Sequence, residues 1–275
     1  MSNVEQLYES QSWIEPFLYF TVLLFFLLAI ILFALTIYSR FKRNRNEALD
    51  HKYSAMIEDV LIKVIFYDKT FKEIENEEIS VDLLQDGIFR KNMMKSVIEL
   101  HKNYEGIYAK KLEDFYLESR LIKDSFKKLK NPNWEIKCQG IMEVSEMNIS
   151  KAFDSLVKIS KKKNKILKIT AINACIKLNG TNGILHLIKH KHRFDIWTQL
   201  NIIEAIKRSN TREIDGIELL LASKNKSVVS LGLKIIHTFQ LSNNITFVED
   251  LHQTSRSISI KNEAQKVLEN LSIVV

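Results

Sequence analysis

Three histidines close together in the sequence offer a first candidate for chemistry, a metal site. His186 and His190 lie one helical turn apart, a spacing that zinc ligands use, and His192 follows two residues later. Basic side chains alternate with these histidines and oppose a bound cation, and Asp195 is the only carboxylate nearby. The basic residues are Lys189, Lys191 and Arg193. The pattern therefore favours a solvated helix end over a metal site.

Other catalytic arrangements are no better indicated. Glu143 and Glu146 could form a carboxylate pair on one helix face, but such pairs occur on most solvated helices. Cys138 and Cys175 fall on apolar stripes of predicted helices, so we expect reduced thiols and no disulfide. The sequence contains neither a glycine-rich phosphate loop nor a Gly-x-Ser-x-Gly motif. We therefore expect no enzymatic activity, no cofactor and no metal.

The element nearest the N-terminus is predicted to be a membrane helix. Residues 17–38 contain no charged side chain, and as a helix they would cross a hydrocarbon layer of roughly 30 Å. A cleaved signal would need a basic start, whereas the first 15 residues carry Glu5, Glu9 and Glu15 and no Lys or Arg. We expect a single transmembrane helix over residues 16–39, preceded by an extracytoplasmic tail, residues 1–15.

The charged flank of this helix predicts its orientation. A basic juxtamembrane segment, residues 40–52, begins with four basic side chains, and short flanks rich in Lys and Arg stay in the cytoplasm. They are Arg40, Lys42, Arg43 and Arg45. We expect a protein of the inner (cytoplasmic) membrane with its C-terminal part in the cytoplasm. The same cluster could bind anionic lipid headgroups, although its role in topology is sufficient to explain it.

The remaining chain is predicted to be all-α and repetitive. Only 7 Gly and 2 Pro occur in 275 residues, too few for the turns of many short strands. A column of mostly small residues recurs at spacings of about 30 residues, as in a helical repeat. Its members are Gly140, Ala171, Leu200, Gly232 and Ala264. A small residue lets a helix approach its neighbour closely, and second helices are expected at residues 151–159, 183–189, 214–222 and 246–252.

Residues 131–137, Asn-Pro-Asn-Trp-Glu-Ile-Lys, open the first unit and resemble the Asp-Pro-x-x-x-Val-Arg opening of HEAT repeats. With the small-residue column, this makes residues 130–275 similar to the short bacterial and phycobilisome-lyase-type HEAT proteins, with about five repeats, the last partial. The departures are Asn in place of Asp and the loss of Pro in later units. The resemblance implies an α-solenoid that stacks helical hairpins and binds a protein partner.

Several expectations follow from this resemblance alone. The second helices would form the partner-binding surface, with Lys158, His186, Lys189 and Glu218 as example contacts. Related bacterial proteins accompany glycosyltransferases, which implies a link to envelope or surface-polysaccharide machinery. The alternative is an enzyme or regulatory subunit of lyase-like or glycosylase-like type on the same fold.

Residues 53–129 are predicted to form a helical stem or a divergent capping repeat. Its first helix is amphipathic, so dimerisation through this helix is an open alternative. The predicted core contacts of the segment are Met94, Val97, Ile98, Tyr108, Leu112, Phe115, Leu121 and Phe126.

The charge of the chain is concentrated on the predicted repeats. Residues 130–275 hold 22 Lys or Arg against 13 Asp or Glu. The run Lys161, Lys162, Lys163 and Lys165 is read as a solvated loop or as a basic rim that attracts an acidic protein, a lipid or a nucleic acid. Nucleic acid is the least favoured, because aromatic residues are not interleaved with the basic ones. We expect a membrane-anchored adaptor that binds a cytoplasmic or membrane protein.

Overall fold

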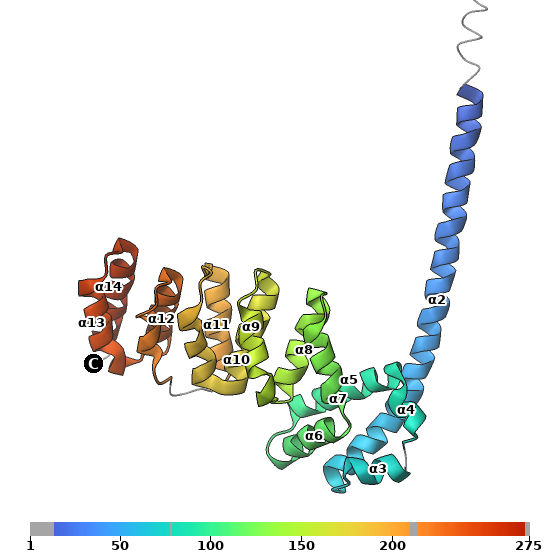
Figure 1. Cartoon of the computed structure of the whole chain (residues 1–275), viewed down its shortest axis with the longest axis horizontal. Helices are drawn as coiled ribbons and strands as arrows, with labels where there is room; N and C mark the ends of the chain where they lie inside the picture. Colours follow the sequence, from blue (N-terminus) through green and yellow to red (C-terminus); the bar gives the residue numbers. More distant parts are fainter. Residues whose placement is uncertain (1–13, 78, 210–213, 273–275) are drawn as a thin grey trace, which may run out of the picture.

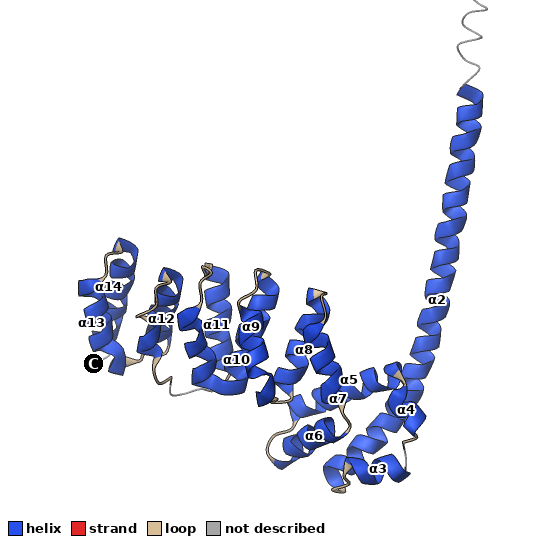
Figure 2. Cartoon of the chain, viewed as in Figure 1, coloured by secondary structure: helices blue, strands red, loops and turns tan. Residues whose placement is uncertain are grey.

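The structure is a computed structural model that describes residues 14–77, 79–209 and 214–272. The described residues form helices and connecting loops without a strand, which confirms the all-α prediction (Figure 2). The N-terminal half contains α2 (Ile14–Phe66), α3 (Phe71–Glu77), α4 (Val81–Gln85), α5 (Gly87–Asn103), α6 (Ile107–Glu118) and α7 (Leu121–Lys130). The C-terminal half contains α8 (Trp134–Glu146), α9 (Phe153–Ser160), α10 (Lys165–Leu185), α11 (Ile196–Arg208), α12 (Lys226–Thr238), α13 (Ile245–Thr254) and α14 (Ile258–Ser272). The short 3₁₀ turns are η1 (Ser150–Ala152), η2 (His186–Lys189), η3 (Ile217–Leu220) and η4 (Ser242–Asn244).

Helix α2 is a single element of 53 residues, about 80 Å long at 1.5 Å per residue. It includes the one helix span in the described residues that is long and apolar enough to cross a membrane. Its apolar half is exposed, whereas its C-terminal half packs on α5 and α6. The buried side chains of that half are Tyr53, Ile57, Val60, Leu61, Val64 and Ile65. The predicted limits at residues 39 and 52 therefore lie inside one unbroken helix.

Helices α8 to α14 lie side by side in a row that extends sideways from the lower half of α2 (Figure 1). The buried hydrophobic residues of the folded part fall in two clusters, one running from Tyr53 to Cys175 and the other from Ile172 to Leu271. The first cluster continues across residue 130, where the sequence places a domain boundary. A continuous core thus joins the base of α2 to the row through α5, α6 and α7.

The longer helices of the row begin in the same way. Asn133, Asn164, Asp195 and Asn225 each accept a hydrogen bond from a backbone N–H in the first turn of α8, α10, α11 and α12. Such caps satisfy donors that would otherwise lack a partner. We call these four helices and α14 the first helices, and the shorter α9, η2, η3 and α13 between them the second elements. The caps recur at spacings of about 30 residues and fix the register of each unit.

This register corrects the predicted column in its third unit. Gly140, Ala171 and Gly232 each lie seven residues after a cap, and the equivalent position after Asp195 is Ile202, which is buried. Leu200 is instead 53% exposed, so its assignment to the column is wrong. The predicted column rests on the pattern of apolar side chains, and the first turn of α11 carries such side chains on its exposed face.

The small residues do allow close approach between elements. A Cβ atom at Gly140 would lie 2.9 Å from both the Leu129 backbone N and the Ser125 carbonyl O of α7. At Gly232 it would lie 3.0 Å from the Leu220 Cβ in η3. In both cases the small residue contacts the element that precedes its helix, as the close-packing interpretation predicts.

Of the four predicted second helices, one is shorter than expected and one is divided between two elements. Residues 151–159 and 246–252 correspond to α9 and α13, but residues 214–222 contain only the turn η3. Residues 183–189 comprise the end of α10 and the turn η2, after a break in α10 at Asn179 and Gly180. Gly180 has φ of 41° and Gly216 has φ of 75°, conformations that favour glycine and end regular helix. Part of the third connection, residues 210–213, lies outside the described residues.

Candidate binding surfaces

The four basic residues predicted at the membrane interface lie on α2 immediately after its apolar half. Arg40, Lys42, Arg43 and Arg45 are all exposed. Arg43 forms an ion pair with Glu47 at 3.5 Å, one helical turn further on. These exposed basic side chains mark the point where the apolar half of α2 ends.

The four residues predicted to contact a partner differ in their freedom to do so. Lys158 and Lys189 are exposed. His186 is partly buried, with its Nδ1 2.6 Å from the Gly183 carbonyl and its Nε2 3.3 Å from the Ser160 Oγ. Burial lowers the pKa of His186 to about 4, so its ring is neutral near neutral pH. Glu218 accepts a hydrogen bond from Asn244 at 3.3 Å. Thus only the two lysines present free side chains.

The histidine cluster does not converge on one point. The rings of His186 and His190 lie 6.5 Å apart, and His190 is buried against Phe194 at 4.9 Å, while His192 is exposed. Within the described parts of the chain, no group of three or more His, Cys, Asp or Glu side chains could hold a metal ion. The helical spacing of the first two histidines therefore brings them side by side without a third ligand.

Glu143 and Glu146 form ion pairs within the fold, and the Cys175 thiol is buried. Glu143 is buried, accepts a hydrogen bond from the Ser125 Oγ at 2.6 Å and forms an ion pair with Lys128. Glu146 forms an ion pair at 2.6 Å with Lys177 of α10. The two carboxylates thus fasten α8 to different neighbours. Burial raises the pKa of the Cys175 thiol to about 12, which keeps it protonated.

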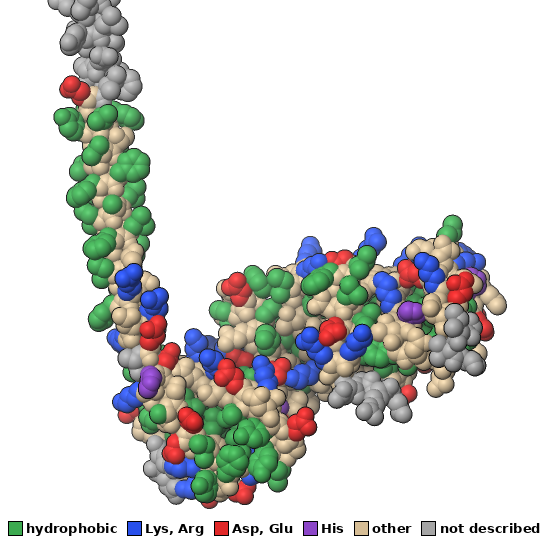
Figure 3. Space-filling model, turned by 180° about the vertical axis from the view of Figure 1, so that it is seen from behind, with side chains coloured by type: hydrophobic (Ala, Val, Ile, Leu, Met, Phe, Trp, Pro, Cys, Tyr) green, Lys and Arg blue, Asp and Glu red, His purple; other side chains and the backbone are tan. Residues whose placement is uncertain are grey.

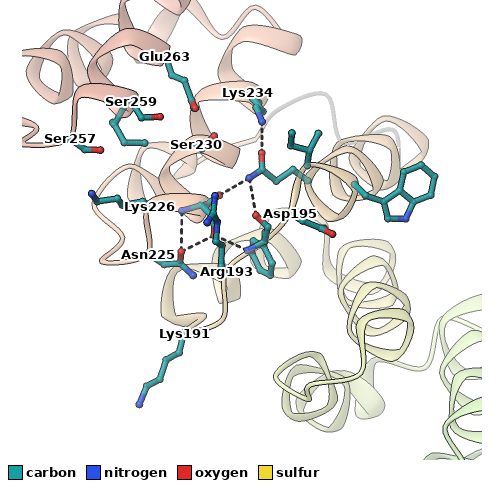
Figure 4. A pocket seen from close by; sticks show the side chains of 16 residues that line it. Lys191, Arg193, Asp195, Asn225, Lys226, Ser230, Lys234, Ser257, Ser259 and Glu263 are labelled. Carbon is teal, nitrogen blue, oxygen red and sulfur yellow. Dashed lines mark hydrogen bonds between the residues drawn. The ribbon is translucent and has the colours of Figure 1, made fainter.

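A hollow of about 1120 Å³ lies where α11, α12 and α14 begin (Figure 4). Asn225 organises it by donating to the carbonyls of His190 and His192, both at 2.9 Å, and by accepting from the Ser227 Oγ at 2.7 Å. Lys234 donates to the Gln199 Oε1 at 2.5 Å across the same hollow. These bonds link neighbouring units, so the N-terminal ends of the first helices are held together.

The charges around this hollow favour an anionic ligand at its outer margin. Lys191, Arg193 and Lys226 line it and are exposed. Asp195 lies among them and stays ionised, because hydrogen bonding to Lys165 and to Thr198 holds its pKa well below the ordinary value. Its negative charge is paired with Lys165. Glu263 contributes a buried carboxylate oxygen without a hydrogen-bond partner on the inner side. The hollow therefore offers electrostatic binding rather than a nucleophile with its base.

A second candidate surface, the aromatic patch, lies at the C-terminal end of α2. We define it as Phe66, Tyr67, Tyr104, Ile107 and Tyr108. Phe66 packs against Tyr104 and Tyr108 with ring centroids 6.5 and 6.0 Å apart. Tyr108 is 39% exposed rather than part of the core, which corrects the prediction for this residue. Figure 3 shows hydrophobic side chains gathered at this lower end of the molecule. Helical periodicity placed Tyr108 on the same face as the buried Leu112 and Phe115 but could not show that the first turn of α6 is less covered than the turns that follow.

Comparisons with known proteins assign no role to these surfaces. No protein family matches the sequence, and no curated protein is significantly similar to it. Among solved structures, an engineered protein aligns at 15% identity and a TM-score of 0.31, over 70% of this chain and 96% of that one. A likeness at this level supports no conclusion about fold or function.

Proposed function

We propose that this protein is a membrane-anchored scaffold that binds a protein partner in the cytoplasm. The observation that carries the proposal is the exposed apolar half of α2. Residues 17–38 form a continuous apolar surface on all sides of the helix, far larger than the patches that soluble proteins tolerate. A bilayer would cover this surface, since every backbone hydrogen bond is satisfied within the helix.

The proposed orientation places the helical row in the cytoplasm of a bacterial cell, at the inner membrane. Its support is the cluster of exposed basic residues between the apolar half of α2 and the folded part, against a purely acidic N-terminal tail. A reporter fused after Val275 tests it. Activity of a reporter that functions only outside the cytoplasm would contradict the orientation.

We further propose that the row is a HEAT-like solenoid. Its support is the recurrence of capped first helices, each with a residue seven positions after the cap packed in the core. A unit of this size cannot bury its apolar face alone, so neighbouring units must stack. Stacking leaves an extended surface suited to partner binding.

The aromatic patch is the best-supported site for the partner. It lies at the far end of α2 from the apolar half, about 21 residues or 32 Å beyond the last residue of the basic cluster, so a bilayer cannot cover it. Exposed aromatic side chains supply much of the binding energy of protein interfaces. The patch is also preorganised, because Lys111 donates to the Ile65 carbonyl at 2.6 Å and lies 5.3 Å from the Tyr108 ring.

Crosslinking in intact membranes, followed by mass spectrometry, tests the scaffold proposal. The wild-type chain is expected to recover one abundant protein partner, and an envelope or glycosyltransferase component would match the association that the HEAT resemblance implies. The double variant Phe66→Ala/Tyr108→Ala is expected to reduce that recovery about tenfold, because it removes two aromatic contacts.

Two matched variants separate the candidate surfaces. Phe247→Ala removes an exposed aromatic ring elsewhere, on α13, and is expected to leave recovery unchanged. Lys158→Ala/Lys189→Ala tests the second-element surface. Loss of the partner in this variant alone would move the binding surface there, and recovery of no partner from the wild type would overturn the scaffold proposal.

A further inference from the structure

One edge of the row carries the N-terminal ends of all the first helices. Lys165 at the start of α10 forms an ion pair with the cap Asp195 of α11. The starts of α11, α12 and α14 share the hollow described above. Figure 1 shows the C-terminal end of α14 at the lower side of the row, so these starts lie at the upper side. We call this side, with the connectors that lead into the first helices, the basic edge.

The exposed charges of the basic edge are strongly one-sided. Connector 161–164 carries Lys161, Lys162 and Lys163, all exposed. Connector 190–195 carries exposed Lys191 and Arg193, and its single acid, Asp195, is neutralised by Lys165. At the opposite edge, connectors 147–149 and 239–241 carry no charge, and the described part of connector 209–216 carries one acid, Asp215. Among the described connectors, the exposed basic side chains therefore lie on one edge.

Apolar side chains stand among these charges. Ile258, the first residue of α14, is 78% exposed, and Trp197, the second residue of α11, is 62% exposed. Trp134, Ile166 and Ile196 are likewise exposed in the first two residues of their helices. Basic side chains interspersed with Trp and Ile match the headgroup region of a bilayer, which attracts cations by charge and accepts amphipathic rings.

The basic edge also faces the same way as the apolar half of α2. Both lie on the upper side in Figure 1, and Figure 3 shows some of the Lys and Arg side chains of the row at its upper margin, near the height at which basic side chains surround α2. The connection between them is packed at each step: the Tyr53 hydroxyl of α2 donates to Asp86 at 3.0 Å, its ring lies edge-on to Phe89 of α5 at 5.3 Å, and α5 and α7 in turn contact α8. Insertion of α2 therefore brings the basic edge to the surface of the same bilayer.

We propose that the basic edge docks on that bilayer by binding anionic lipid headgroups, which holds the row along the membrane surface. This inference rests on the proposed anchoring by α2. Docking of the edge turns the aromatic patch away from the membrane and toward the cytoplasm. The scaffold would then present its protein-binding surface at a fixed height.

The three tryptophans of the chain allow a direct test with the full-length protein in vesicles of brominated lipid. Trp13→Phe leaves Trp134 and Trp197 as reporters of the edge. In phosphatidylcholine vesicles containing phosphatidylglycerol, we expect their fluorescence to be quenched several-fold more than in phosphatidylcholine alone. Adding Lys162→Glu/Arg193→Glu should abolish the difference, whereas Lys151→Glu/Lys207→Glu, which reverses exposed charges away from the connectors of the basic edge, should preserve it.

A second reporter separates failure of the edge from failure of the anchor. Trp134→Phe/Trp197→Phe leaves only Trp13, which precedes the apolar half of α2 and is quenched if α2 inserts. Quenched Trp13 with unquenched edge reporters would overturn the docking proposal and leave the anchor intact. Unquenched Trp13 would overturn the anchor itself. Edge reporters shielded in native membranes but not quenched by bromolipid would indicate an acidic protein on the edge, which also overturns lipid docking.

Discussion

His190 illustrates how a single residue links the packing of the row to pH. Its side chain is 2% exposed, and neither ring nitrogen makes a hydrogen bond of normal geometry. Burial, followed by the neighbouring His186, lowers its pKa to about 4, although the backbone of Ser160 acts in the opposite direction. The folded chain therefore holds this ring neutral at pH values where the unfolded chain protonates it.

The free energy of unfolding should consequently fall as the pH is lowered. The contribution of neutral His190 is complete above the ordinary histidine pKa of about 6.5 and declines by about 1.4 kcal/mol per pH unit until the folded ring protonates near pH 4. Thermal unfolding between pH 7 and pH 5 measures this slope. His190→Leu should reduce it, and the exposed control His192→Leu should not. An unchanged slope in His190→Leu would contradict the assigned burial.

At the scale of elements, the close approach of α7 and α8 depends on Gly140. A methyl group there would meet the backbone of Ser125 and Leu129 at 2.9 Å, and a helix backbone cannot move aside as a side chain can. The clash should outweigh the gain in helix propensity of about 1 kcal/mol, so Gly140→Ala should destabilise the fold by about 1–3 kcal/mol. Chemical denaturation of the full chain in detergent measures this difference.

Gly232 is the matched control in the same column. The nearest atoms to its added Cβ are the Leu220 Cβ at 3.0 Å and the flexible Leu221 Cδ2 at 3.1 Å, and the nearest backbone atom lies 3.8 Å away. Gly232→Ala should therefore change the free energy of unfolding by less than about 1 kcal/mol. Equal losses in the two variants would show that the backbone contact at Gly140 is not the cause.

For the whole molecule, the direction of the row relative to the membrane depends on the continuity of α2. Residues 40–45 of α2 are exposed, so they contribute no core packing there. Asn44→Pro should kink or break the helix at this point while leaving the buried contacts from Tyr53 onward intact. The melting temperature should change little, but quenching of Trp134 and Trp197 by anionic bromolipid should fall severalfold. Asn44→Ala is the control, and full quenching in Asn44→Pro would exclude a rigid connection.

Much of this fold is local in origin and could be predicted from the sequence. The apolar segment, the absence of strands and four of the five column positions follow from composition and periodicity, which act over one or two helical turns. The caps Asn133, Asn164, Asp195 and Asn225 were also available as a sequence signal, and they would have placed Ile202 rather than Leu200 in the column.

Features that depend on contacts between distant segments of the chain could be determined only from the tertiary structure. It showed that α2 is one unbroken helix that extends from the apolar half into the folded part. The C-terminal half of α2 is held there by packing on α5 and α6. The tertiary structure left Tyr108 at the surface, because this residue lies in the first turn of α6, whereas Leu112 and Phe115 further along the same face are buried. It also placed the connectors 161–164, 190–195 and 255–257 on one edge, on the same side as the apolar half of α2. The sequence by itself determined which segments are apolar or basic, and the packing between elements determined the direction in which each of them faces.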